Sequence, residues 1–224
     1  MKTILIIGAS RGLGLEFVRQ YRADGWLTLG TCRSPEQDAL LAAVGATSLR
    51  LDVNDEGGFA ALARTLEGRR IDVCIYNAGV FGPRSNGLAV PTEEEFDHVM
   101  RANVLGAMRA LPVVVPALAR AKGTFAAVSS IMGSIAGLSN AHGMTYRASK
   151  AALNAVVKGA SVEARPQGVT CISLHPGWVK TDMGGSGADI EPSVSIRGMR
   201  KVIADATLEK TGKFFDYTGH PLDW

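Results

Sequence analysis

The sequence predicts an α/β fold in which one parallel sheet is covered by helices on both faces. Three observations lead to this class: short β-branched runs recur along the chain, longer amphipathic segments separate them, and the runs are apolar almost throughout. Strands that are apolar at successive positions are buried on both faces, as in parallel sheets. The 224 residues contain no internal repeat or linker, so we expect residues 1–224 to form a single domain.

About seven strands are expected, and helical patterns fill the gaps between them. The strand candidates, in order, are residues 3–7, 26–32, 47–53, 71–76, 123–129, 169–175 and 213–217. One helix is expected to begin at Thr92, where "TEEE" offers a capping box between Thr92 and Glu95. A later helical segment, after Asn103, contains Pro112 and Pro116. Because proline removes a main-chain hydrogen bond, this helix is expected to kink or restart near residue 111.

Composition narrows the class of protein. Apolar residues make up 46% and charged residues 20%, which is typical of a globular protein. The net charge of +3 comes with no basic block, so neither nucleic acid nor a membrane is expected as a partner. The apolar run before Gly8 is too short for a secretory signal. The cysteines and histidines show no metal-site spacing, so we expect a cytoplasmic protein with reduced cysteines and no metal.

A glycine-rich turn follows the first strand candidate. Residues 8–14 read "GASRGLG" and lead into a helical segment. Glycines permit a tight strand-to-helix turn, and the helix N-terminus offers free N–H groups to a pyrophosphate. Although the spacing G-x-x-x-G-x-G differs from the better-known dinucleotide pattern, the order strand, turn, helix predicts a dinucleotide site. The residues expected to contact the cofactor here are Gly8, Ser10, Arg11, Gly12, Leu13 and Gly14.

The end of the second strand candidate indicates which dinucleotide is bound. Sites for NAD usually carry an acidic residue there, which binds the ribose 2′-hydroxyl. This chain has Arg33 instead, and Arg11 offers a second guanidinium from the glycine turn. Arginine suits the 2′-phosphate of NADP, so we expect NADP(H) as the cofactor, although two solvated arginines would look the same in sequence.

Residues 146–150 read "YRASK", which places a phenol and an ammonium one helical turn apart. Positions i and i+4 share a helix face, so Tyr146 and Lys150 can point into one cleft. A nearby cation favours the ionised form of a phenol, which makes Tyr146 a candidate general acid or base. The same spacing also occurs on ordinary helix surfaces, so the remaining motifs decide between the two interpretations.

Several short motifs occur in a characteristic order along nearly the whole chain. They are the glycine turn, "LDV" at 51–53, "NAG" at 77–79, "ANVLG" at 102–106, "SS" at 129–130, "YRASK" at 146–150 and "HPGWVKTDM" at 175–183. In this ordered set the chain resembles the short-chain dehydrogenase/reductase family, and its carbonyl-reductase and C-factor-like branch in particular. The resemblance implies a Rossmann-type, doubly wound parallel sheet.

The resemblance also implies roles for individual residues. Tyr146 would be the general acid or base, and Lys150 would lower its pKa and hold the nicotinamide ribose. Ser130 would donate a hydrogen bond to the substrate oxygen, while Asn103 would interrupt its helix and hold a water that connects Lys150 to solvent. The remaining implied cofactor contacts are Asp52, Val53, Asn77, Ala78, Gly79, Pro176, Gly177, Val179 and Thr181. Two positions depart from the family pattern: Ile7 replaces a usual threonine, and Tyr76 a common second asparagine.

The sequence allows alternatives for the catalytic serine and for the function. Ser129 and Ser134 are alternatives to Ser130 as the catalytic serine. The resemblance implies an oxidoreductase that acts on a small carbonyl or alcohol and forms a homodimer or homotetramer. The alternative is a sensor or C-factor-like signalling protein that binds NADP(H) with little turnover. The segment after Thr181 is short and rich in glycine, and it does not identify the substrate.

Overall fold

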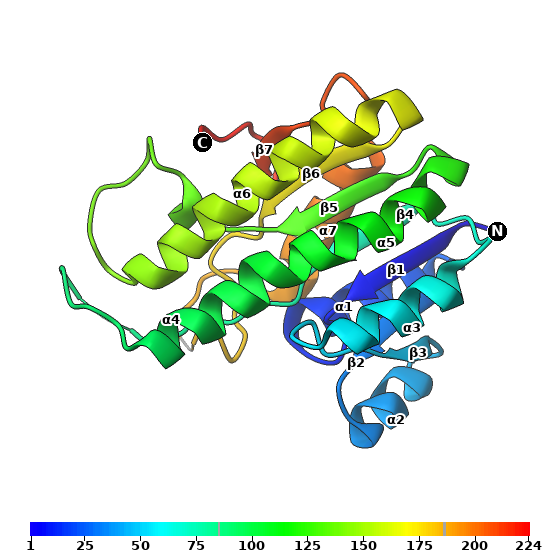
Figure 1. The fold of residues 1–224 in the computed structure, drawn as a ribbon, viewed down its shortest axis with the longest axis horizontal. Coiled ribbons are helices and arrows are strands. Elements are labelled where there is room, and N and C mark those ends of the chain that lie inside the picture. Colours follow the sequence, from blue (N-terminus) through cyan, green and yellow to red (C-terminus); the bar gives the residue numbers. More distant parts are fainter. Residues whose placement is uncertain (85, 186) are drawn as a thin grey trace.

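The computed structural model describes residues 1–84, 86–185 and 187–224 and contains one seven-stranded sheet in which every neighbouring pair is parallel (Figure 1). The strand order is β3-β2-β1-β4-β5-β6-β7, so the direction of winding reverses between β1 and β4. The predicted α/β class and strand number are therefore confirmed. The strands are β1 Thr3–Ile7, β2 Leu27–Cys32, β3 Thr47–Arg50, β4 Val73–Tyr76, β5 Thr124–Val128, β6 Thr170–His175 and β7 Lys213–Asp216.

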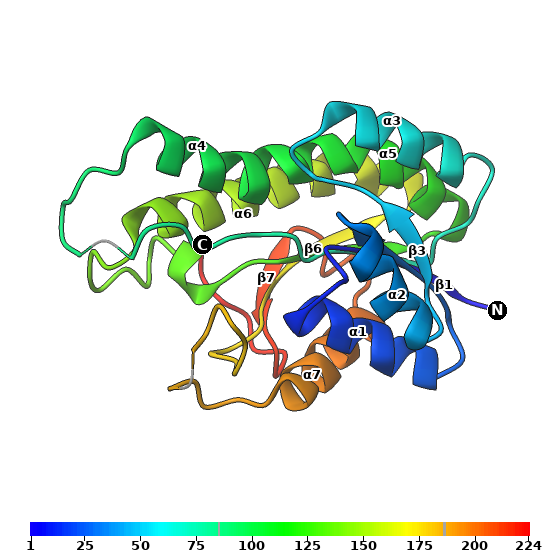
Figure 2. The same cartoon turned by 90° about the horizontal axis from the view of Figure 1, so that it is seen from below.

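Helices cover both faces of the sheet (Figure 2). Helices α1 Gly12–Ala23, α2 Pro35–Ala43 and α7 Pro192–Ala204 lie on one face. On the other face lie α3 Glu56–Leu66, α4 Glu93–Met100, α5 Gly106–Ala121 and α6 Met144–Ala164. This is the doubly wound arrangement, in which ligands bind at the carboxyl ends of the strands beside the reversal.

Alternate residues of each strand enter two separate cores. In β1, Leu5 and Ile7 pack toward α3 and α5, whereas Ile4 and Ile6 pack toward α1 and α7. All four side chains are completely buried. Burying one such side chain contributes roughly 1.5–3 kcal/mol, which explains why positions 4–7 of this strand carry no polar side chain. The cysteines behave as expected of core residues, since all three are free and buried.

The long helical region after residue 92 begins as the sequence predicts, but its irregular turn lies at a different position. At its start the predicted capping box is present: Thr92 Oγ1 accepts from the Glu95 N–H at 3.2 Å, and Glu95 Oε2 accepts from the Thr92 N–H at 3.0 Å. The expected restart near residue 111 is wrong, because α5 runs unbroken through Pro112 and Pro116. Both prolines lie on the exposed face, where water can satisfy the freed carbonyls. The irregular turn lies earlier, as a π-helical turn at Arg101–Leu105.

The span Glu93–Ala121, formed by α4, the π-turn and α5, is long and apolar enough to cross a membrane by length and composition. Half of its most apolar window is buried inside the protein. The buried residues of α5 belong to the core shared with α3 and α6. A core helix of this fold needs the same apolar composition.

Candidate active site

The glycine turn between β1 and α1 is closely packed against the end of β4. Gly8 and Gly12 have φ values of +86° and +51°, in the left-handed region that favours glycine. A Cβ on Gly8 would lie 2.7 Å from the Ala78 nitrogen, and one on Gly14 only 2.0 Å from the Gly8 carbonyl oxygen. The first turn of α1 has neither a side-chain cap nor an acidic residue. Its N–H groups can therefore receive an anion, and the turn fits the pyrophosphate of a dinucleotide.

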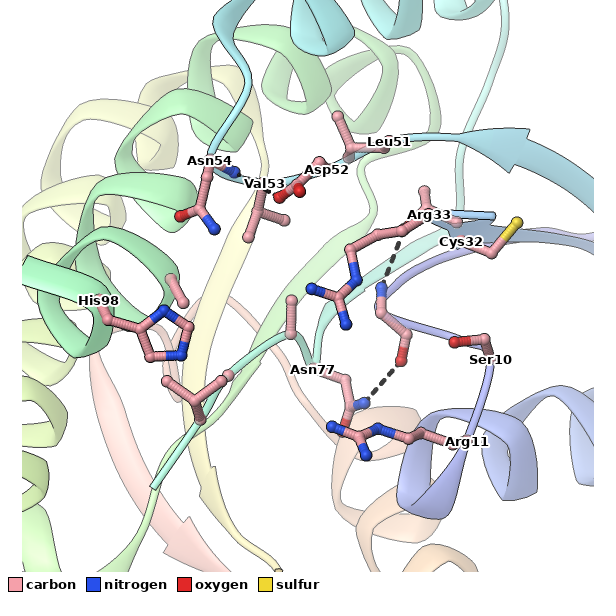
Figure 3. A pocket seen from close by; sticks show the side chains of 16 residues that line it. Ser10, Arg11, Cys32, Arg33, Leu51, Asp52, Val53, Asn54, Asn77 and His98 are labelled. Atoms are coloured by element: carbon pink, nitrogen blue, oxygen red, sulfur yellow. Dashed lines mark hydrogen bonds between the residues drawn. The ribbon is translucent and has the colours of Figure 1, made fainter. Parts of the chain in front are cut away.

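A cleft opens from this turn along the carboxyl ends of β2, β3 and β4 (Figure 3). Arg11 and Arg33 reach into it from the glycine turn and from the end of β2, respectively. Asp52 lines the same cleft, and its Oδ1 accepts a hydrogen bond from the Asn54 N–H at 2.9 Å. Two guanidinium groups against one carboxylate give this cleft a positive balance. The structure thus brings together nine of the expected cofactor residues: Gly8, Ser10, Arg11, Arg33, Asp52, Val53, Asn77, Ala78 and Gly79.

Sequence reasoning missed several residues of this cleft. Asn54 follows the "LDV" motif, and His98 comes from α4, one helical turn before Ala102. Ala102 begins the "ANVLG" motif, and His98 lies four residues before it on the same helix face. This spacing was the signal that could have identified His98. Thr31 was missed as well; its Oγ1 accepts the Gly8 N–H at 2.9 Å and so connects β2 to the glycine turn.

Both departures from the family pattern concern contacts between loops. Asn77 Nδ2 donates to the Gly8 carbonyl at 2.8 Å, which ties β4 to the glycine turn. The preceding residue, Tyr76, is completely buried, and its hydroxyl donates to the Ala102 carbonyl at 2.6 Å. Tyr76 therefore contacts the π-helical turn that contains Ala102. The glycine turn is connected to the end of β4 by Asn77, although position 7 has an isoleucine instead of the usual threonine.

Tyr146 and Lys150 lie on the buried face of α6, as their spacing predicts. Their exposed fractions are 7% and 4%. Lys150 Nζ donates to the Val128 carbonyl at the end of β5 at 2.9 Å and lies 5.5 Å from the centre of the Tyr146 ring. Burial of both groups at the carboxyl end of the sheet excludes the ordinary surface interpretation of "YRASK".

Asn103 lies in the π-turn, so the helix is interrupted at the residue where the resemblance implies it. Its Oδ1 accepts the Val80 N–H at 2.8 Å, and its Nδ2 donates to the Val80 carbonyl and to Ser149 Oγ, both at 2.9 Å. A Cβ on Gly79 would meet Asn103 Oδ1 at 3.0 Å and Lys150 Nζ at 3.6 Å. The absence of a side chain at Gly79 therefore leaves room for both the Asn103 amide and the Lys150 ammonium beside it.

Burial controls the titration of both α6 groups. It raises the pKa of Tyr146 to about 12, while the Ser130 side chain acts in the opposite direction. It lowers the pKa of Lys150 to about 8. In the chain without cofactor, desolvation therefore favours the neutral forms of both groups. That Lys150 lowers the pKa of the phenol, as the resemblance implies, stays a prediction.

The three candidate serines differ in what their hydroxyls contact. Ser129 Oγ is directed to the Lys150 carbonyl at 3.5 Å, and Ser134 Oγ accepts the Gly137 N–H at 3.0 Å. Ser130 Oγ accepts the Met132 N–H at 3.1 Å and lies beside the Tyr146 phenol. This geometry favours Ser130 as the serine that shares a ligand with Tyr146.

The segment after β6 lies next to the start of α1. Thr181 Oγ1 accepts the Gly184 N–H at 3.2 Å, and a Cβ on Gly12 would lie 3.8 Å from the Thr181 methyl group. A second pocket opens here beside Tyr146 and Ser130, lined also by the predicted Leu13, Pro176, Gly177, Val179 and Thr181. A channel lined by Gly12, Gly79 and Thr181 lies between the glycine turn and this pocket, so a dinucleotide could extend from one to the other.

This fold and site define a class: a doubly wound dinucleotide-binding protein with a buried phenol and ammonium beside the expected nicotinamide end. The family model for short chain dehydrogenase matches residues 2–190, and the chain belongs to this family of oxidoreductases.

Three similar proteins illustrate its relationships. C-signal from Myxococcus xanthus is 40% identical over 155 residues, which cover 69% of this chain and 93% of that protein. The carbonyl reductase Sniffer of D. melanogaster superposes with a TM-score of 0.94 at 31% identity and full coverage of both chains. The NADPH-bound carbonyl reductase from chicken fatty liver superposes with a TM-score of 0.90 at 28% identity, covering 100% of this chain and 99% of that one.

Proposed function

We propose that this chain is an NADP(H)-dependent oxidoreductase that transfers a hydride between the nicotinamide and a carbonyl compound or secondary alcohol. The observation that carries the proposal is the placement of Ser130, Tyr146 and Lys150. These buried groups lie at the carboxyl edge of the sheet, and the pocket beside Tyr146 and Ser130 meets the dinucleotide channel at Thr181. The likeness to carbonyl reductases supports the same reaction class.

The residues of this chain would orient the carbonyl group of the substrate and supply the proton. NADPH, when bound, supplies the hydride to the carbonyl carbon. The Tyr146 hydroxyl gives its proton to the carbonyl oxygen, so the products are an alcohol and NADP⁺. Ser130 donates a hydrogen bond to the same oxygen while negative charge develops there. The raised pKa of Tyr146 keeps the phenol protonated at neutral pH, which suits reduction.

The proposal is tested with a panel of aldehydes and ketones, monitored by NADPH absorbance, with NADH in parallel. NADPH-dependent turnover of at least one class of carbonyl compound is the expected result. A second candidate function is an NADP(H)-binding signalling protein with little turnover, favoured by the 40% identity to C-signal. A chain that binds NADPH but reduces nothing in the panel would support this second candidate.

Cofactor choice is expected to depend on Arg33. Its guanidinium enters the cleft along the carboxyl ends of β2, β3 and β4, where the 2′-phosphate would lie (Figure 3). A hydrogen bond to a charged group contributes about 1.5–3 kcal/mol, so Arg33→Asp is expected to weaken NADPH binding roughly 10- to 100-fold and to narrow the preference over NADH. Isothermal titration with both cofactors measures the change. Wild-type protein that binds NADH as tightly as NADPH would contradict this assignment.

Arg11 is a second candidate for the 2′-phosphate. It pairs with Asp182 at 3.7 Å, and both side chains are largely exposed. Exposed ion pairs contribute little, typically about 0–1 kcal/mol, so this pair would not prevent Arg11 from turning to a phosphate.

A homodimer or a dimer of dimers is expected in solution. Several large apolar side chains are exposed on α4, α5 and α6, among them Phe96, Met108 and Val162. A second copy of the chain would bury these side chains across a two-fold axis. Light scattering at micromolar concentration should therefore give at least twice the monomer mass. A single monomeric species would rule the assembly out.

A further inference from the structure

The pocket beside Tyr146 is apolar except at a few positions. Its lining includes aromatic and methionine side chains, notably Phe81, Met132, Trp178 and Met183. Its volume is about 410 Å³, which lies within the size range of pockets for drug-sized ligands. Such walls favour a substrate with a flat apolar body, such as an aromatic carbonyl compound.

Arg84 is the permanently charged side chain among the described residues that line this pocket. Apart from the Tyr146 phenol, the ionisable side chains among the described residues of its lining are Arg84, His142 and His175, and none is a carboxylate. Asp182 lines the neighbouring channel, where it pairs with Arg11. An apolar pocket whose fixed charge is a guanidinium fits a ligand that carries an anionic group.

Arg84 and the Tyr146 phenol contact the same aromatic ring, that of Phe81. Its guanidinium carbon lies 4.9 Å from the centre of the Phe81 ring, and the Phe81 and Tyr146 rings stack with centres 4.5 Å apart at 21°. Phe81 therefore lies between the phenol and the cation. Tyr146 and Arg84 line the same pocket, so an aromatic substrate that spans it can place its carbonyl oxygen at Tyr146 and an anionic substituent at Arg84.

The guanidinium retains donors for such a substituent. One N–H of Arg84 donates to the Met183 carbonyl at 3.0 Å, which anchors the cation to the segment after β6. This bond uses one of the five N–H donors that a guanidinium has, and a carboxylate can accept hydrogen bonds from two of the other donors in parallel. The anchoring contacts with Met183 and Phe81 reduce the side-chain freedom that would be lost on binding.

We propose that the preferred substrates of this site are aromatic carbonyl compounds that carry a carboxylate, with Arg84 as the residue that selects for the negative charge. This proposal rests on the oxidoreductase function proposed above. It adds the substrate class and a specificity residue that takes no part in the transfer of hydride or proton.

The test compares 4-formylbenzoate with its methyl ester, which differ in charge but share the ring and the aldehyde. For each enzyme the ratio of kcat/KM for the acid to that for the ester is measured at low salt. Arg84→Gln is expected to lower this ratio about tenfold, because it removes a charge-assisted hydrogen bond. Loosening of the Met183 contact would affect both aldehydes and cancel in the ratio. The control Arg120→Gln removes an exposed guanidinium on α5, which donates to the Pro116 carbonyl of its own helix, and should leave the ratio unchanged.

A binding measurement separates failure of this proposal from failure of the oxidoreductase function. Calorimetry with 4-(hydroxymethyl)benzoate and its methyl ester, on protein saturated with NADPH, measures binding without turnover, because a reduced cofactor cannot oxidise an alcohol. Preferential binding of the acid that is lost in Arg84→Gln supports the substrate class even if reduction is not detected. Reduction of the ester with an acid-to-ester ratio unaffected by Arg84→Gln would overturn the substrate class and leave the oxidoreductase function standing.

Discussion

Tyr146→Phe is expected to reduce turnover by about 10²–10⁴-fold, the usual effect of losing a general acid. The phenyl ring preserves the stack against Phe81, and the glycine turn lies on other elements. NADPH affinity should therefore change little. Stopped-flow reduction and isothermal titration together separate the two quantities.

Tyr21→Phe is a matched control, because Tyr21 is an equally buried tyrosine of α1 outside the site. It should retain wild-type turnover. If Tyr146→Phe also retained wild-type turnover, Tyr146 would not be the proton donor.

The pH profile gives a second readout of the same residue. Reduction needs the phenol and should fall as pH rises through its pKa, whereas oxidation needs the phenolate and should rise. The chain without cofactor has this pKa at about 12. Because the oxidised nicotinamide is cationic, the corresponding limb of the oxidation profile should lie below that value and should disappear in Tyr146→Phe.

Lys150→Met is expected to impair both binding and turnover. The substitution removes the buried cation beside the phenol and leaves the Val128 carbonyl without its 2.9 Å donor. We expect NADPH affinity to fall about tenfold and turnover to fall at least as far as in Tyr146→Phe. Lys158→Met, which removes a cation two turns further along α6, is the matched control and should change neither quantity.

Lys150 also makes stability depend on pH with a definite sign. Its pKa is about 8 in the fold and about 10.5 otherwise, so between these values the unfolded chain binds the additional proton. The unfolding free energy should therefore rise with pH across this window in wild-type protein, and less so in Lys150→Met. Urea unfolding of both proteins at pH 7.5 and 10 measures the difference. An equal pH dependence in the two proteins would show that burial does not lower the pKa of Lys150.

The fold could be predicted from the sequence because the central strands, such as β1 and β4, are apolar on both faces. Residues such as Ile4 and Leu5 have to be buried on opposite faces of the sheet, which requires helices on both faces. The glycine turn and the Tyr146–Lys150 pair were visible for a related reason, since each is a short local pattern. The prolines of α5 misled the prediction, because their effect depends on which helix face reaches solvent.

The substrate side of the site was not predictable in the same way. Phe81, Arg84 and Trp178 lie outside the helices and strands, so no periodicity indicates their direction. Their proximity to Tyr146 arises only when the segments after β4 and β6 meet above the sheet. The raised pKa of Tyr146 was missed as well, because the sequence shows the neighbouring Lys150 but not the extent of burial.

The order of the strands has a consequence for how the chain folds. Strand β1 pairs with β4, with Ile4 opposite Val73, while β2 and β3 lie on its other side. The chain must therefore close a long loop before the two strands that flank the glycine turn become neighbours, and contacts this distant in sequence are slow to form. The contacts that hold the glycine turn against Asn77 and Ala78 form only after β1 and β4 have paired. A dinucleotide that binds this turn would thus favour the folded chain, and its concentration would influence how much of the chain is folded.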